Sequence, residues 1–164
     1  MAHKTLVVGT GITGRSVMRY LQNMNIDFDV FDTRFELADL SILEKQYPKA
    51  TFYLADDSKI DWQVIELVIV SPGIAPSTPV IAMAKSLGIK VAGDLEIFAK
   101  HQQQKPLIVI SGTNGKSTVT TLVSYILEYA GLKVALAGNI GLGMLDSLAD
   151  DYDYYDVWLL ELSS

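Results

Sequence analysis

The chain has 164 residues, a formal charge of −6 and a composition that is 49% hydrophobic and 20% charged, so it can form one domain, or one small domain plus part of another. The acidic balance gives no support to binding of a nucleic-acid polymer, whose phosphates attract basic surfaces. The absence of cysteine excludes disulfides, thiolate metal sites and a cysteine nucleophile.

The first hundred residues alternate apolar strand patterns with helical ones. Short apolar runs predict strands at residues 5–8, 28–32, 67–70 and 89–92. Helical spacing predicts one helix after the first strand, ending at Asn25, and another that begins at a Ser77 cap and ends at Gly88. Alternation of this kind indicates a parallel sheet covered by helices.

The pattern changes around residues 94–106, where a short helix is followed by a polar stretch that ends at a proline. Beyond it, strands are predicted at 107–110, 133–137 and 156–160, with helices at 119–130 and 142–149. Three strands and two helices are few for a complete domain. We therefore expect an α/β protein: a Rossmann-like parallel-sheet domain in residues 1–93, a linker in 94–106, and the truncated start of a P-loop ATPase-type central domain in 107–164.

A glycine-rich segment directly follows the strand at 107–110. It reads Gly112-Thr113-Asn114-Gly115-Lys116-Ser117-Thr118. The backbone N–H groups of such a turn, together with the start of the next helix, hold phosphate. Lys116 can reach the β- and γ-phosphates of ATP, and Ser117 can offer its hydroxyl to Mg²⁺. The general phosphate-loop motif has an earlier glycine where this chain has Ile110, so only the shorter form of the motif is met.

An acidic residue, Glu161, ends the apolar strand at 156–160. Mg²⁺ prefers hard oxygen ligands and is usually held by few protein groups plus phosphates. The sequence therefore predicts that Ser117 and Glu161 hold the metal. The alternative is an acid that ends a strand without a role in binding.

A second glycine motif, Gly9-Thr10-Gly11-Ile12-Thr13-Gly14, lies between the first strand and the first helix. Asp32 follows Gly14 by 18 residues, at the end of the second strand. This is the dinucleotide-binding fingerprint, which alone favours an NAD-binding oxidoreductase domain. Arg34 places a cation beside the acid, which fits a phosphate-bearing ligand better, and a dehydrogenase needs no second nucleotide loop. A role of the glycines in packing alone also stays open.

Taken together, these motifs resemble the Mur ligases of peptidoglycan synthesis, and within that family the branch that adds D-glutamate. The segments that carry the resemblance span the chain in the family's order: residues 9–14, 32–34, 71–75, 93–98, 112–118, 137–141 and 160–164. The short phosphate loop is the form that this family uses.

The resemblance implies an ATP- and Mg²⁺-dependent ligase that joins D-glutamate to UDP-N-acetylmuramoyl-L-alanine through an acyl phosphate. It implies that Lys116 and Glu161 are catalytic and that residues 112–118 bind ATP. The implied contacts to the UDP-substrate are Ile12, Thr13, Asp32, Thr33, Arg34, Gly73, Asn139 and Ser163. The family's D-glutamate-binding domain lies beyond Ser164, so we expect an N-terminal fragment that binds but does not ligate.

The sequence carries no secretion signal, and no apolar stretch approaches the roughly 18–20 residues of a membrane helix. We therefore expect a cytoplasmic protein without membrane contact. We also expect a monomer. Two other functions stay open: a non-catalytic nucleotide-binding module built on the same loops, and an NAD-dependent oxidoreductase domain.

Overall fold

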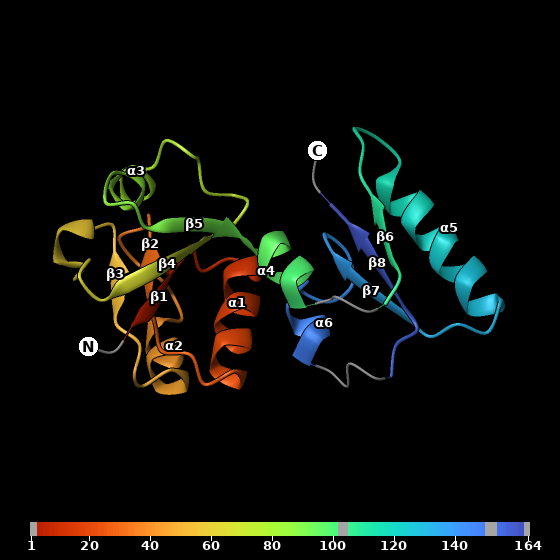
Figure 1. Cartoon of the computed structure of the whole chain (residues 1–164), viewed down its shortest axis with the longest axis horizontal. Coiled ribbons are helices and arrows are strands. Elements are labelled where there is room, and N and C mark those ends of the chain that lie inside the picture. The colour runs from red at the N-terminus through yellow and green to blue at the C-terminus, as the bar shows by residue number, and fades with distance from the viewer. Residues whose placement is uncertain (1–2, 102–104, 150–153, 163–164) are drawn as a thin grey trace. The chain divides into compact units, whose positions relative to one another are not determined.

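The computed structural model describes residues 3–101, 105–149 and 154–162. The chain divides into two compact units, Met1–Glu96 and Ile97–Ser164, and the division falls inside helix α4, Asp94–His101. Each unit is an α/β structure with its own parallel sheet (Figure 1). The α/β fold is therefore confirmed, and the assignment of residues 94–106 as a linker stays a prediction.

The first unit is a five-stranded parallel sheet in the order β3-β2-β1-β4-β5. Its strands are β1 Lys4–Val8, β2 Phe28–Asp32, β3 Phe52–Leu54, β4 Ile65–Val70 and β5 Lys90–Gly93. Its helices are α1 Ile12–Asn23, α2 Leu40–Gln46 and α3 Pro79–Ser86, with a 3-10 turn, η1, at Asp57–Lys59. The strand order is that of the first five strands of a Rossmann fold.

The core of this unit lies on both faces of its sheet, because successive strand side chains point to opposite faces. Leu6 and Val8 of β1 join a buried cluster with Val80 and Ala84 of α3. Val7, between them, is fully buried on the other face. Figure 1 shows α1 and α3 on opposite faces of the sheet, as expected where the chain winds outward from β1 in both directions.

Of the helix ends predicted for this unit, the one at Asn25 is confirmed and the one at Ser77 is not. Asn25 has a φ of 54°, the left-handed conformation that commonly follows a helix end, and its N–H donates to the carbonyl of Gln22. The predicted cap at Ser77 is wrong, because Thr78 precedes the helix and Pro79 occupies its first turn. Proline suits that position, since the first helical N–H groups have no partner within the helix.

The second unit is a three-stranded parallel sheet in the order β6-β8-β7. Its strands are β6 Leu107–Ile110, β7 Val134–Gly138 and β8 Val157–Glu161, and its helices beyond α4 are α5 Lys116–Tyr129 and α6 Asp146–Ala149. Every residue of β8, the central strand, is buried. The indole of Trp158 is fully buried; its Nε1 donates to Ser147 Oγ at 3.2 Å, and its ring packs edge-on against Phe98.

Candidate functional site

The glycine loop of the first unit lies where the sheet changes its winding direction. β1 is hydrogen-bonded to both β2 and β4, so the loops that leave β1 and β4 diverge there, as at ligand sites of open α/β sheets. Gly9 donates its N–H to Phe31 at 2.7 Å, and Ser71 donates its N–H to Val8 at 3.0 Å. The loops after β1, β2 and β4 therefore meet at the carboxyl ends of these strands.

The glycines of this loop serve two different purposes. A Cβ on Gly14 would lie 1.8 Å from the carbonyl oxygen of Gly9, so this glycine is needed for α1 to approach β1. A Cβ on Gly11 would meet nothing within 4 Å. Gly11 precedes α1 as its N-cap residue, at the helix end where backbone N–H groups attract anions. The structure therefore assigns packing to Gly14 and leaves space for a ligand at Gly11.

Replacing Gly14 with alanine is expected to destabilise the first unit by at least about 2 kcal/mol, because the new methyl group overlaps a backbone oxygen. Gly11→Ala is the matched control and is expected to cost less than about 1 kcal/mol of stability. Its added methyl group should nevertheless weaken binding of an anionic ligand at the start of α1. Urea unfolding of both variants, with titration of UDP into the folded Gly11 variant, measures both effects. Equal stability of the two variants would contradict the packing role.

Asp32, at the end of β2, is the centre of a buried hydrogen-bond network. Its Oδ2 accepts from the N–H and the hydroxyl of Thr10, at 2.8 and 2.7 Å. Its Oδ1 accepts from the N–H and Nε of Arg34, at 3.0 and 2.8 Å. Burial alone would raise the pKa of Asp32, but these bonds outweigh it and hold the pKa far below the usual range. Asp32 is therefore an anion that fixes the glycine loop.

This network bears on the choice between an NAD site and a phosphate-bearing ligand. In the dinucleotide fingerprint the acid binds the ribose, but here both carboxylate oxygens already accept from Thr10 and Arg34. The side chain of Arg34 remains 57% exposed. The arrangement favours a ligand that meets the guanidinium of Arg34 rather than one that meets the carboxylate.

The loop is also fixed by residues that the sequence motif does not indicate. Arg15 donates from Nε to the carbonyl of Thr10 at 2.9 Å and from Nη1 to Asp39 at 2.6 Å. Arg15 and Asp39 are 24 residues apart, and no local sequence pattern predicts that they pair. Thr10, between two glycines, is the residue in the motif that could have indicated such partners. A buried threonine in a tight loop needs a hydrogen-bond partner.

The other predicted contacts of the first unit differ in exposure. Ile12, the first residue of α1, is 82% exposed, and Thr33 and Gly73 are also exposed. Thr13 is half-buried. These four residues follow the carboxyl ends of β1, β2 and β4, so the fold brings them to the edge that carries Asp32 and Arg34.

The phosphate loop of the second unit connects β6 to α5. Gly112 and Gly115 have φ values of 151° and 75°, a conformation that favours glycine. Thr113 and Asn114 between them are exposed, and α5 begins at Lys116. The ammonium of Lys116 donates to the carbonyl oxygen of Gly112 at 2.5 Å, so the lysine folds back over the loop.

Glu161 ends β8, the strand next to β6, and lies beside the start of α5. It is 3% exposed, and its Oε1 accepts from the hydroxyl of Ser117 at 3.3 Å. Its Oε2 is buried and has no hydrogen-bond partner among the described residues. A buried carboxylate oxygen without a partner beside a serine hydroxyl fits the oxygen ligands of Mg²⁺. Within the described ranges no group of three or more histidine, cysteine, aspartate or glutamate side chains that could hold a metal ion is present. Mg²⁺ is commonly held by one or two carboxylates together with phosphates and water.

Asn139 follows β7 on the other side of Glu161. Its N–H donates to the carbonyl oxygen of Glu161 at 2.9 Å, and its side chain is exposed. A Cβ on Gly138 would lie 2.3 Å from the same oxygen, so only glycine permits this approach. Asn139, Glu161 and Ser117 therefore lie together, whereas Ser163 is outside the described residues.

The family model for the N-terminal domain of MurD-like Mur ligases matches residues 3–93. The chain belongs to the Mur ligase family. The matched residues hold the whole five-stranded sheet and the glycine loop of this Mur ligase chain.

Curated relatives of the chain extend well beyond it. A UDP-N-acetylmuramoylalanine–D-glutamate ligase of Legionella pneumophila (strain Paris) is 46% identical over 159 residues, which cover 97% of this chain and 35% of that protein. A protein of the same name from Pseudomonas putida is 43% identical over 160 residues, covering 97% and 34%. The chain thus spans about a third of the length of these relatives.

Solved structures agree on the fold at lower identity. UDP-N-acetylmuramate-alanine ligase MurC of Thermotoga maritima matches 99% of this chain with a TM-score of 0.55 and 19% identity, over 37% of its own length. The UDP-N-acetylmuramate:L-alanyl-gamma-D-glutamyl-meso-diaminopimelate ligase of Neisseria meningitides matches 98% with a TM-score of 0.59 and 15% identity, over 52% of its length. In the described part of the chain no helix has the length and apolarity to cross a membrane.

Proposed function

We propose that this chain supplies the UDP-substrate-binding and ATP-binding parts of a ligase that adds D-glutamate to UDP-N-acetylmuramoyl-L-alanine. The observation that carries the proposal is the buried Oε2 of Glu161, which has no hydrogen-bond partner among the residues that the structure describes, in a side chain that lies beside Ser117 at the start of α5. The relatives named UDP-N-acetylmuramoylalanine–D-glutamate ligase support the choice of substrates.

In this proposal the phosphate loop binds ATP through its backbone N–H groups and the start of α5. Lys116 exchanges the carbonyl of Gly112 for the β- and γ-phosphates and neutralises charge during phosphoryl transfer. Ser117 and Glu161 hold Mg²⁺, which supplies further positive charge to the phosphoryl oxygens.

The reaction joins two substrates without a protein nucleophile. The substrate carboxylate takes the γ-phosphoryl group of ATP, giving an acyl phosphate and ADP; the amine of D-glutamate then attacks, and phosphate leaves as the amide forms. The phosphate loop, Lys116 and the metal site act on the first of these steps. This scheme is consistent with a chain that has no cysteine.

The first unit binds the UDP end of the substrate in this proposal. The start of α1 and the guanidinium of Arg34 provide positive charge for the diphosphate, while Asp32 keeps the glycine loop in place. Ile12, Thr13, Thr33 and Gly73 surround the same edge of the sheet.

Binding measurements on the purified chain test this assignment. UDP-N-acetylmuramoyl-L-alanine and ATP·Mg²⁺ should each raise the melting temperature, because a ligand that binds only the folded state stabilises it. NADH should leave the melting temperature unchanged. A shift with NADH and none with the UDP-substrate would instead support an oxidoreductase domain. Stabilisation by ATP alone would favour a non-catalytic nucleotide-binding module.

Three further statements belong to the same proposal: that the chain is cytoplasmic, that it is a monomer, and that these 164 residues alone do not ligate. A phosphate-release assay with both substrates and ATP·Mg²⁺ addresses the last statement. Release of phosphate that requires D-glutamate would contradict it.

A further inference from the structure

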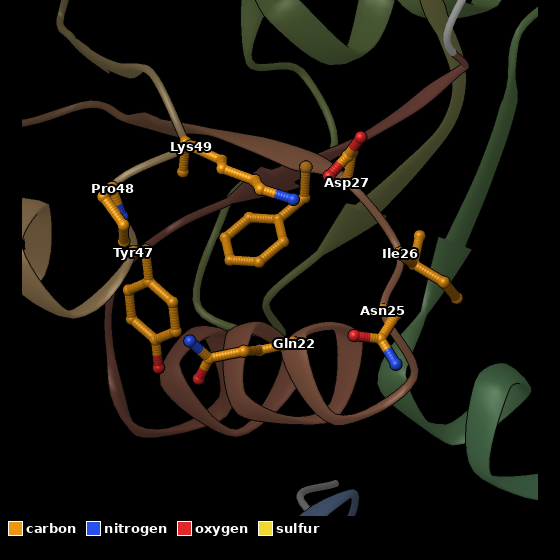
Figure 2. Close-up of a pocket in the computed structure, with 9 residues that line it drawn as sticks. Gln22, Asn25, Ile26, Asp27, Tyr47, Pro48 and Lys49 are labelled. Atoms are coloured by element: carbon orange, nitrogen blue, oxygen red, sulfur yellow. The ribbon is translucent and has the colours of Figure 1, made fainter.

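A pocket lies in the first unit at the edge of the sheet opposite the glycine loop. Its volume is about 240 Å³, and it lies between the end of α1, the start of β2 and the turn after α2 (Figure 2). It is lined by Gln22, Asn25, Ile26, Asp27, Phe28, Tyr47, Pro48, Lys49 and Ala50. The amino end of β2 forms part of this pocket, whereas its carboxyl end carries Asp32, so the pocket is separate from the proposed UDP site.

The pocket combines two buried aromatic rings with two exposed charges. Phe28 and Tyr47 are 7% and 4% exposed, and they pack edge-to-face with centroids 5.5 Å apart. Asp27 and Lys49 are exposed, and Figure 2 shows their side chains on the same side of the pocket, with Gln22 on the other. Neither charged side chain has an ion pair or hydrogen bond to another residue in the described part of the chain.

The charges and the volume of the pocket restrict the size and the chemical class of the ligand that it can bind. A volume of about 240 Å³ is below the roughly 300–1,000 Å³ of sites for drug-sized ligands, which limits the occupant to about one amino acid. A nucleotide phosphate would meet the carboxylate of Asp27. A zwitterion instead places its ammonium against Asp27 and its carboxylate against Lys49, and an apolar side chain then meets Phe28 and Tyr47.

We propose that this pocket binds a free α-amino acid with an apolar or aromatic side chain, at a site independent of the UDP and ATP sites. Asp27 binds the ammonium, Lys49 binds the carboxylate, and the edge-to-face pair of Phe28 and Tyr47 receives the side chain. Asn25, fixed in the left-handed conformation after α1, presents its amide at the same opening.

The test is a titration of the isotope-labelled 164-residue chain with L-phenylalanine, followed by amide NMR shifts. We expect saturating shifts in residues 22–28 and 47–50, and the same shifts when UDP is present at saturation. N-acetylphenylalaninamide, which lacks both charges, should bind about tenfold more weakly or worse. Equal binding of this neutral compound, displacement of phenylalanine by UDP, or shifts confined to other residues would overturn the proposal.

Two charge variants separate the site from unspecific binding. Asp27→Asn and Lys49→Met should each weaken phenylalanine binding about fivefold or more, because each removes one charged contact. Lys45→Met is the matched control, since Lys45 is exposed on α2 and does not line the pocket. Asp27 and Lys49 are both exposed, so the melting temperatures of their variants should stay close to that of the parent. Parent-like binding by both charge variants would reject the assigned contacts.

Discussion

Lys116→Met is expected to lower the affinity of the chain for ATP·Mg²⁺ by about 10- to 100-fold, since hydrogen bonds to charged groups contribute about 1.5–3 kcal/mol. In the free chain the ammonium already contacts Gly112 inside the loop, so little rearrangement is needed to reach a bound phosphate. Isothermal titration gives the affinity directly. Lys133→Met is the control. Lys133 lies at the amino end of β7, whereas the phosphate loop follows the carboxyl end of β6, and its ammonium lies over the ring of Tyr154.

The metal contribution is measured with Glu161→Gln, which keeps the shape of the side chain and removes its charge. The gain in nucleotide affinity on adding Mg²⁺ should be lost in this variant, while binding without metal persists. The reason is that Oε2 has no hydrogen-bond partner among the described residues and is available to a cation. An unchanged Mg²⁺ dependence in Glu161→Gln, or equal losses in the two lysine variants, would remove the basis for the proposed ATP site.

Asp32→Asn is expected to reduce the free energy of unfolding of the first unit by about 2–4 kcal/mol. An amide cannot accept at both positions, so Thr10 or Arg34 loses a charge-assisted bond and the glycine loop loses its anchor. UDP affinity should fall with it. Urea unfolding followed by circular dichroism measures the change. Asp56→Asn, at a half-buried aspartate paired with Lys59, is the control and should cost less than about 1 kcal/mol.

The same carboxylate sets an acid dependence whose sign follows from its lowered pKa. Its contribution to stability is complete above the unfolded pKa of about 3.9 and is lost as the pH falls from there toward the lower pKa of the folded state. Between about pH 4 and pH 2, Asp32→Asn should therefore lose stability less steeply than the parent. Parallel acid profiles for the two proteins would show that Asp32 is not held in its charged form.

The sequence predicted the strands well because each is a short apolar run bounded by turn residues. The strands at 28–32 and 107–110 have the predicted bounds. α2 and β3 were missed: α2 has seven residues with only Leu43 buried, and β3 is a three-residue edge strand whose side chains are all half-buried. Elements this short carry too few periodic positions to stand out from a loop.

The apolar stripe of α5 shows a different limit. Val119, Leu122 and Ile126 predicted the helix correctly, yet all three are exposed, the last two at 58%. The buried residues of α5 are instead Thr120 and Ser124. Periodicity reports that a helix has an apolar face, but it does not report what packs against that face.

For the candidate site, the motifs located the loops, and the structure adds the contacts that their side chains make. The ligand contact of Asp32 stays a prediction, and the structure shows that its carboxylate is also bonded to Thr10 and Arg34. The sequence predicted that Ser117 and Glu161 act together, and the pairing of β6 with β8 brings these residues, 44 positions apart, within hydrogen-bond distance. The pairing of Arg15 with Asp39 was not predicted, because it depends on how distant segments pack, which a single sequence does not state.

The central position of β8 has a consequence for the order in which the two units form during synthesis. In the described part of the chain β8 is the strand that joins β6 to β7, which do not pair with each other, so the second sheet cannot assemble until residues 157–161 have been made. The first sheet is complete at Gly93, which is 68 residues earlier. At translation rates of about 5–20 residues per second, the ribosome therefore holds a finished first sheet beside an unassembled second one for roughly 3–14 s.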